Sequence, residues 1–307
     1  MTRYLGYRIL SSLVVILGAA TIIFVAIRAV PGDPALVVLG PSATPEQVAA
    51  LRTEYGLDGS LLGQYMHFLA RMATFDFGSS FRLGMPATQA ISQAFTATLS
   101  LALAALCIAL MIGFPLGILC ALRPNGWSDR IISSLSMTGQ ALPSFWVGIM
   151  LVMIFSRMLR ILPSGGAETP EAILMPAVTL ALPLLSIIVR LVRSGLLEVL
   201  GEGYVQTARA KGLREPRVVG RHALRNMLIP VVTVVGLELG GLLGGAVIVE
   251  TVFAWPGLGR LLIDSIAARD YSVVQACVVV LVLGFVSINL IVDLLYGYLD
   301  PRVRVGS

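Results

Sequence analysis

Lysine is almost absent from this sequence of 307 residues, in which Lys211 is the only one. Gly212 follows it, so the chain has no GxxxxGK(S/T) loop and does not bind ATP by that device. Histidine is nearly as rare, and neither HExxH nor GxSxG occurs. No nucleophile paired with a base is recognisable either. We therefore expect no enzymatic activity and no catalytic, cofactor-binding or metal-binding residue on this chain.

Cysteine and charge are also scarce. Cys107, Cys120 and Cys277 lie far apart in apolar runs and form no CxxC, which favours a packing role for all three. Charged residues make up 13% of the chain and hydrophobic residues 57%, and the latter gather into long runs. This pattern excludes a soluble single domain.

The apolar runs are long enough to cross a membrane, which takes about 20 residues per helix. Five windows carry no charge: Ile9–Ile27, Leu83–Leu122, Ile131–Ser156, Ala172–Val189 and Tyr271–Val292. A sixth, Met227–Val249, is interrupted only by Glu238. The first window is longer than the apolar core of a secretory signal and lacks a cleavage site, so it predicts an uncleaved span. Six spans place both termini on one side of the membrane.

Basic residues indicate which side that is, because cytoplasmic loops retain Lys and Arg. With the N-terminus inside, 14 of the 22 Lys and Arg residues are cytoplasmic, and His67 and His222 fall on opposite sides. The net charge of +5 then reflects topology and not nucleic-acid binding. We expect an N-terminus and first span over 1–30, an extracytoplasmic cap over 31–90, a transmembrane core over 91–300 and a cytoplasmic tail over 301–307. The core includes a cytoplasmic loop over 190–226.

Proline and glycine interrupt several spans. Pro143 must kink the third span or end a half-helix, and the fourth contains Pro176 and Pro183. Such breaks occur beside a transport pathway, but they also occur as packing kinks. The fifth span contains overlapping GxxxG spacings, which favour close helix packing within the chain or against a second subunit. Its glycines are Gly236, Gly240, Gly241, Gly244 and Gly245.

The loop over 190–226 is the main basic interruption. Its pattern predicts a helix over Leu197–Lys211 that stops at Gly212, and a second helix with Pro216 in its first turn. Tyr204, Ala208 and Lys211 are spaced to share one face of the first helix, which we interpret as a docking surface. In the second helix, Arg217, Arg221 and Arg225 form a basic stripe suited to anionic lipid headgroups.

Several motifs in this order carry a family resemblance: FGSSFRLGMP, ALPSFW, YVQTARAKGL, RHALRNMLIPVVT, GGLLGGAVIVETVFAWPGLGRLL, ARDYSVVQA and LLYGYLDPRVR. Over nearly its whole length the chain closely resembles the permease subunits of bacterial ABC importers for dipeptides, oligopeptides and nickel, the inner-membrane components of binding-protein-dependent transport. The resemblance implies an all-α, six-span type I importer fold in the bacterial plasma membrane.

The same resemblance implies an assembly: a second homologous permease, two cytoplasmic ATPase domains that carry ATP and Mg, and an extracytoplasmic substrate-binding protein. YVQTARAKGL is similar to the family's EAA loop, whose coupling helix inserts into a groove of the ATPase. Gln206 and Thr207 stand where many families have Glu-Ala. The residues assigned to coupling in this way are Tyr204, Gln206, Thr207, Ala208, Arg209, Lys211 and Gly212.

Three polar residues within spans are candidates for the translocation pathway: Glu238, Gln140 and Asn289. Each also suits an interhelical hydrogen bond. The most favoured function is an ATP-driven permease that imports dipeptides or short oligopeptides by alternating access. Nickel or haem cargo and a stand-alone transporter driven by an ion gradient through Glu238 are the alternatives. The sequence does not identify the cargo or the partner permease.

Overall fold

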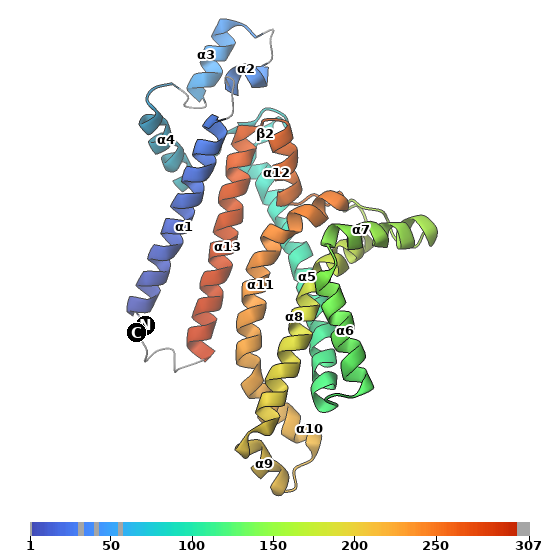
Figure 1. Ribbon diagram of the computed structural model, residues 1–307. Coiled ribbons are helices and arrows are strands. Elements are labelled where there is room, and N and C mark those ends of the chain that lie inside the picture. Colours follow the sequence, from blue (N-terminus) through green and yellow to red (C-terminus); the bar gives the residue numbers. More distant parts are fainter. Residues whose placement is uncertain (1, 30–33, 40–42, 55–57, 300–307) are drawn as a thin grey trace. The chain divides into compact units, whose positions relative to one another are not determined.

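The computed structural model describes residues 2–29, 34–39, 43–54 and 58–299, and it is almost entirely helical (Figure 1). The expected tail over 301–307 lies outside these residues. The chain divides into two compact units, one of residues 1–99 and 254–287 and the other of residues 100–253 and 288–307. Residues 254–287 thus belong to the same unit as the expected cap, and the expected division into segments 31–90 and 91–300 stays a prediction.

Within the described residues, five helical segments are long and apolar enough to cross a membrane. They are Gly6–Ala29, Ala87–Leu122, Pro170–Gly201, Pro230–Val252 and Tyr271–Leu294. A sixth candidate is a pair of helical segments, Trp127–Ala141 and Ser144–Met158, bent by 103°. The break falls at Leu142 and Pro143, where the backbone is extended at both residues. The predicted third span is thus two half-helices, as Pro143 indicated.

The first unit contains the cap elements, the long helix α1 and parts of two other long helices. Its helices are α1 (Thr2–Ala29), α2 (Pro34–Leu39), α3 (Pro45–Glu54), α4 (Leu61–Ala73), the start of α5 (Ala87–Leu122), α12 (Leu258–Ala267) and most of α13 (Tyr271–Leu299). Strands β1 (Ser79–Ser80) and β2 (Met85–Pro86) form an antiparallel hairpin. Buried apolar residues such as Phe24, Phe68, Ile91, Leu258 and Cys277 form one core.

Three hydrogen bonds join distant motifs of this unit. Ser80 Oγ lies 2.5 Å from Asp270 Oδ2, and both residues are buried. Trp255 Nε1 donates to the Ala97 carbonyl at 2.9 Å, and the Leu258 N–H donates to Thr98 Oγ1 at 2.8 Å. The motifs FGSSFRLGMP, AWPGLGRLL and ARDY therefore hold the hairpin, α5, α12 and α13 together.

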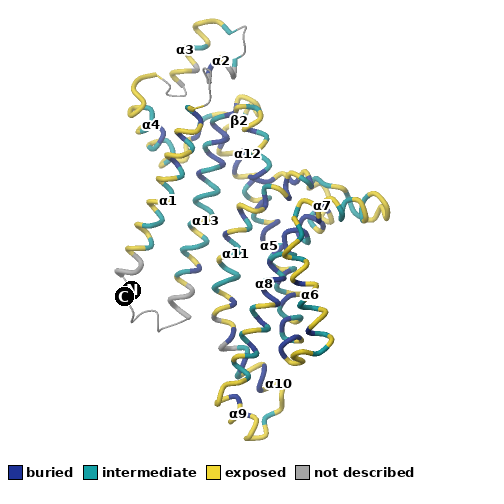
Figure 2. Tube along the Cα trace, viewed as in Figure 1, coloured by how far each residue is buried: buried dark blue, intermediate teal, exposed yellow. Residues whose placement is uncertain are grey.

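The second unit is organised around α8 (Leu174–Gly201), against which α6 (Trp127–Ala141) and α11 (Leu224–Val252) make the most extensive contacts. Its other elements are the remainders of α5 and α13, α7 (Ser144–Leu151), the π-helix η1 (Val152–Met158), the 3₁₀-helix η2 (Pro170–Ile173), α9 (Gly203–Ala210), α10 (Glu215–Arg217) and the π-helix η3 (Val218–Ala223). Buried residues recur along α8 between Met175 and Leu196, among partly buried ones (Figure 2).

Close helix contact in this unit depends on glycines of α5. A Cβ at Gly117 would lie 2.7 Å from Val192 Cβ, and one at Gly113 would lie 3.1 Å from Ile188 Cγ2, both on α8. These two glycines, spaced as GxxxG, allow the α5 and α8 backbones to approach. Cys120 of α5 is buried as expected for a packing residue, whereas Cys107 is exposed in this chain, contrary to that expectation.

Candidate functional site

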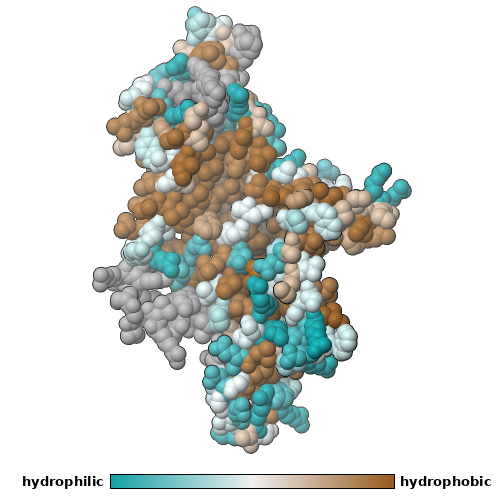
Figure 3. Space-filling view, viewed as in Figure 1, coloured by the Kyte–Doolittle hydropathy of each residue, from teal (hydrophilic) through white to brown (hydrophobic). Residues whose placement is uncertain are grey.

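The loop between α8 and α11 is polar on the outside and apolar beneath. Hydrophilic residues gather over α9 and α10 (Figure 3). The predicted single helix over Leu197–Lys211 is wrong: α8 ends at Gly201, Glu202 is extended with φ −68° and ψ 144°, and α9 starts at Gly203. The break follows from the two glycines that flank Glu202, since glycine disfavours a helix interior.

The short helix α9 is held by an apolar face. Val205 and Ala208 are buried with Val218 of η3, and Leu200 and Leu213 pack against them. Ala208 is only 6% exposed. The prediction that Ala208 shares an exposed face with Tyr204 and Lys211 is therefore wrong. The physical reason is the i, i+3 pair of Val205 and Ala208, which turns this side of α9 towards the protein.

The end of α9 is fixed by a turn and an ion pair. Gly212 has φ +76°, which glycine adopts without strain, and its N–H donates to the Arg209 carbonyl at 2.9 Å. Arg209 Nε lies 2.7 Å from Glu215 Oε1. The hydrogen bond from this guanidinium to Glu215 raises the pKa of Arg209 above its usual value. The predicted stop at Gly212 is confirmed, and Pro216 lies in the first turn of α10 as predicted.

The remaining coupling candidates form the outer face of α9 and the turn after it. Tyr204 is 43% exposed. The other exposed members are Gln206, Thr207, Arg209, Lys211 and Gly212. This face combines an aromatic ring, amide and hydroxyl groups and two cations on a helix supported from behind. Such a surface suits docking of another protein. Arg217 and Arg221 of the basic stripe are also exposed, and the side chain of Arg225 lies outside the described residues.

A pocket of about 420 Å³ lies between α6 and α8, and one pathway candidate, Gln140, is in its lining. Hydroxyl and basic side chains dominate its lining, which includes Ser133, Ser134, Ser136, Ser186, Arg130 and Arg190. Neither of these two arginines contacts a carboxylate within the part of the chain that the structure describes. The pocket therefore combines hydrogen-bonding groups with positive charge.

A buried ion pair forms one wall of this pocket. Asp129 of α6 accepts from Arg193 Nε at 2.6 Å and from Arg193 Nη2 at 2.8 Å. Its carboxylate also accepts from the Asn125 N–H at 2.9 Å and from Ser133 Oγ at 3.2 Å. Sequence reasoning missed this pair. Its signal was an isolated acid, Asp129, between two arginines in the short segment RPNGWSDR.

The other pathway candidates do not line this pocket. Glu238 on α11 and Asn289 on α13 are each partly buried, and no hydrogen bond of either side chain occurs within the described residues. The described residues also contain no cluster of His, Cys, Asp or Glu suited to a metal ion. A role of Glu238 or Asn289 in transport stays a prediction.

The glycines of α11 differ in their surroundings. A Cβ at Gly236 would lie 2.4 Å from Val292 Cγ2, so this glycine permits contact between α11 and α13. Gly240 is buried. A Cβ added at Gly241, Gly244 or Gly245 would have no heavy atom of a described neighbour within 4 Å. Gly236 therefore shows the predicted packing inside the chain, and Gly241, Gly244 and Gly245 do not show it among the described residues.

Comparison with protein families supplies the identity of this architecture. Residues 113–305 match the family described as the inner membrane component of binding-protein-dependent transport systems, and residues 1–102 match its N-terminal region. The chain belongs to this family. It is a permease subunit of a bacterial ABC transporter, a multi-pass protein of the inner membrane and not an enzyme.

Full-length relatives support the same assignment. The chain is 41% identical over 304 residues to the glutathione transport system permease protein GsiC of Salmonella typhimurium, covering 99% of each chain. The Escherichia coli K12 protein of the same name is 38% identical over 304 residues, with the same coverage. The predicted resemblance to peptide-type ABC permeases is thereby confirmed.

Solved structures show the fold of this permease. The MetNI methionine ABC transporter in an inward facing conformation aligns with a TM-score of 0.55 and 20% identity, over 68% of this chain and 96% of that chain. An amino acid ABC transporter with histidines aligns with a TM-score of 0.55 and 16% identity, over 69% and 94% of the two chains. The predicted type I importer permease fold is confirmed.

Proposed function

We propose that this permease is one of two membrane-spanning subunits of an ATP-driven importer of short peptides, and that α9 couples it to the ATPase. The observation that carries the cargo class is the 41% identity over 99% of the chain to a glutathione transport permease, since glutathione is a peptide. A binding protein, two ATPase domains and a second permease complete the proposed assembly.

The pocket between α6 and α8 supports a peptide cargo. Peptides carry amides and carboxylates, which hydrogen-bond to hydroxyl, amide and guanidinium groups. Gln140 and the pocket serines supply the first two kinds of group, and Arg130 and Arg190 supply positive charge. Because Asp129 is engaged by Arg193, it does not cancel the charge of these arginines. The lining therefore favours peptides with net negative charge.

The support of α9 fits a coupling role. A helix that transmits force must keep its position relative to the spans, and α9 is anchored by the buried Val205, Ala208 and Val218. The C-terminal end of α9 also carries an ion pair, in which Arg209 Nε lies 2.7 Å from Glu215 Oε1. A partner that moves α9 as a rigid body would move the attached end of α8 with it.

The proposed function is tested by uptake of labelled glutathione and labelled dipeptides into proteoliposomes. These contain the permease, the proteins encoded beside it, and ATP inside. Wild type is compared with Ala210→Glu on the exposed face of α9, and Ala49→Glu on the exposed face of α3 is the matched control. We expect Ala210→Glu to reduce ATP-driven uptake at least tenfold, a typical effect of disrupting an interface centre.

Distinct results contradict the two parts of the proposal. Uptake without ATP by this chain alone would show a stand-alone transporter. An intact, ATP-hydrolysing assembly that takes up neither glutathione nor dipeptides would refute the peptide cargo. Equal uptake by the Ala210→Glu and Ala49→Glu proteins would refute coupling through the exposed face of α9.

A further inference from the structure

A second pocket, of about 70 Å³, lies in the first unit where α4 meets the end of α1 and the start of α13. Basic and hydrogen-bonding side chains line much of it, among them Arg28, Gln64, His67, Arg71, Tyr271 and Gln275. The volume exceeds that of a single water site several-fold. It accommodates a small polar group and not a peptide.

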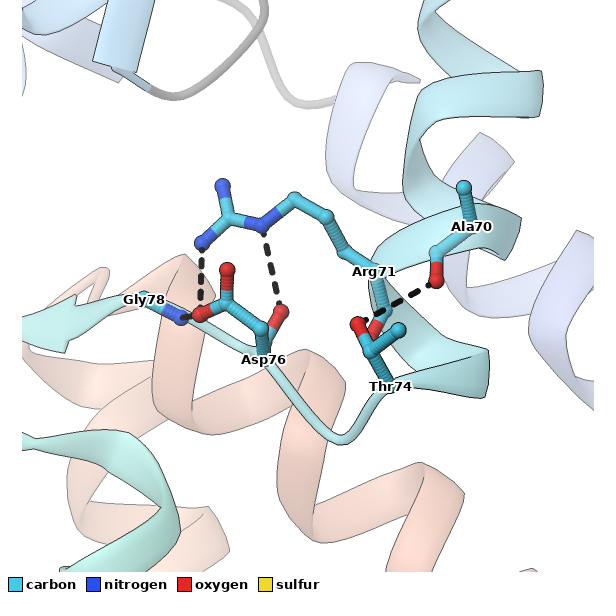
Figure 4. Close-up of polar contacts among 5 residues, drawn as sticks. All are labelled: Ala70, Arg71, Thr74, Asp76 and Gly78. Carbon is cyan, nitrogen blue, oxygen red and sulfur yellow. Dashed lines mark hydrogen bonds and ion pairs between the residues drawn. The ribbon is translucent and has the colours of Figure 1, made fainter.

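One of the two pocket arginines is already neutralised. Arg71 Nη2 lies 3.3 Å from Asp76 Oδ1, and Arg71 Nε donates to the Asp76 carbonyl at 3.1 Å (Figure 4). The Gly78 N–H donates to the same Oδ1 at 3.1 Å. The Gly78 N–H and the Arg71 guanidinium hold the pKa of Asp76 below its usual value, so this carboxylate stays charged at neutral pH. Arg71 and Asp76 together add no net charge to the pocket.

Arg28 is different, because no carboxylate contacts it among the described residues. Its Nε donates to Gln64 Oε1 at 2.9 Å, and its guanidinium carbon lies 3.5 Å from the centroid of the Phe24 ring. These contacts hold the guanidinium plane in place, and no carboxylate among the described residues compensates its charge. His67 is the remaining ionisable group of basic type in the lining. The pocket therefore carries a net positive charge of at least one.

The pocket lies where two candidate membrane spans end. Arg28 is the penultimate residue of the candidate span Gly6–Ala29, and Tyr271 is the first residue of the span Tyr271–Leu294. Lipid phosphates lie where spans end, and tyrosine is enriched there. Helix α4 exposes Leu61, Leu62 and Met66, which are 68%, 72% and 60% exposed. An amphipathic helix with this exposed apolar face is suited to lie in the interface among lipids.

We propose that this pocket binds the phosphate of an anionic phospholipid headgroup, with Arg28 as the principal contact and His67 and Tyr271 as further hydrogen-bonding groups. A phosphodiester carries one negative charge, which matches the one uncompensated arginine. The planar guanidinium also offers the paired donors that phosphate oxygens accept. The lipid would tie α1, α4 and α13 together at the membrane surface.

The test measures lipid bound to the complete transporter complex in phosphatidylcholine nanodiscs with added phosphatidylglycerol, by native mass spectrometry. Arg28→Gln removes the charge, and Arg28→Lys retains it. Gln64→Glu keeps the acceptor for Arg28 Nε and adds a competing carboxylate, and it also removes the 3.3 Å hydrogen bond from Gln64 Nε2 to the Gly59 carbonyl. Arg52→Gln on α3, which is exposed and outside the pocket, is the matched control.

We expect Arg28→Gln and Gln64→Glu each to lower bound phosphatidylglycerol about fivefold or more, the factor expected for one arginine near a lipid surface. Arg28→Lys, which keeps the charge but not the paired donors, should lose less lipid than Arg28→Gln, and Arg52→Gln should retain it. Unchanged lipid in Gln64→Glu would overturn the proposal, as would an equal loss in Arg52→Gln. The lipid-free complex in detergent is also tested with inorganic phosphate. If phosphate stabilises the complex through Arg28, and no lipid is retained in nanodiscs, the site binds free phosphate and the lipid proposal is overturned.

Discussion

The ion pair between Asp129 and Arg193 offers a sharp test of how the second unit is held together. Asp129 is 3% exposed and accepts from both Arg193 nitrogens, at 2.6 and 2.8 Å. Asp129→Asn keeps the shape of the side chain but removes its charge and turns one acceptor into a donor that faces Arg193. Breaking one partner of a buried pair costs about 3–5 kcal/mol. We expect Asp129→Asn to lower the free energy of unfolding by about 3 kcal/mol, the lower end of this range, because the Arg193 side chain is 31% exposed and water will reach it.

The assay is unfolding of the purified transporter complex in detergent, followed by heat and by denaturant titration. Arg193→Gln and the double variant Asp129→Asn/Arg193→Gln complete a double-mutant cycle. The double variant should be more stable than the sum of the single effects predicts, since neither charge is then left alone. Asp264→Asn is the control, because its partner Arg260 lies 3.8 Å away and both side chains are exposed. Such a surface pair contributes about 0–1 kcal/mol.

A small effect would refute this reasoning. If Asp129→Asn costs less than about 1 kcal/mol and no more than Asp264→Asn, the pair does not clamp α6 to α8. If the cycle shows additive effects, Asp129 contributes through Asn125 and Ser133 and not through Arg193. A loss of glutathione uptake without loss of stability would instead assign the pair to the transport pathway.

Three further predictions address the backbone, the cap and the loop. Gly165→Ala should destabilise the fold by about 1–3 kcal/mol in unfolding experiments, because the added Cβ would lie 2.2 Å from the Phe253 carbonyl oxygen. Gly18→Ala is the control and should not destabilise the fold, because no atom lies within 4 Å of the added Cβ. The pKa of Asp76 is lowered by the Gly78 N–H and Arg71, so its stabilisation of the cap is complete above the usual carboxyl pKa and is lost as pH falls through the lower folded value. Protection of the Gly78 amide from hydrogen exchange should fall at such acidic pH, and Asp76→Asn should abolish that dependence. Glu202→Gly creates three consecutive glycines between α8 and α9 and should lower uptake per ATP hydrolysed several-fold, whereas Glu202→Ala should not. Equal coupling in both Glu202 variants would contradict a rigid connection.

The sequence predicted the features that depend on neighbouring residues. Charge-free windows located the long helices, Pro143 marked the broken span, and Gly212 marked the end of α9, because each signal acts within a few residues. Pairing between distant segments was not predictable. Asp129 and Arg193 are separated by 64 positions, and only the packing of α6 on α8 brings them together. Nothing in either local sequence specifies that packing.

Prediction of the direction in which α9 points failed for a similar reason. A helix continuous from Leu197 would have fixed the angle of Ala208 relative to α8, but the break at Glu202 resets that angle. The orientation then depends on which residues find an apolar partner, and Val218 of η3 lies beyond the turn. The GxxxG pattern was similarly ambiguous. It occurs in α11, where Gly241, Gly244 and Gly245 face open space, and in α5, where Gly113 and Gly117 contact α8.

Helix α8 connects the two parts of the candidate site. Ser186, Arg190 and Arg193 of this helix line the polar pocket, while Leu196, one turn further on, is buried with Ala121, Val219 and Ala223. The helix then ends at Gly201, and the single residue Glu202 separates it from α9, which begins at Gly203. A displacement of α9 therefore acts on a helix whose other residues form a wall of the pocket. Because Asp129 binds Arg193 from α6, the opposite wall is tied to the same helix, and the pocket would change shape as α6 and α8 move together or separate.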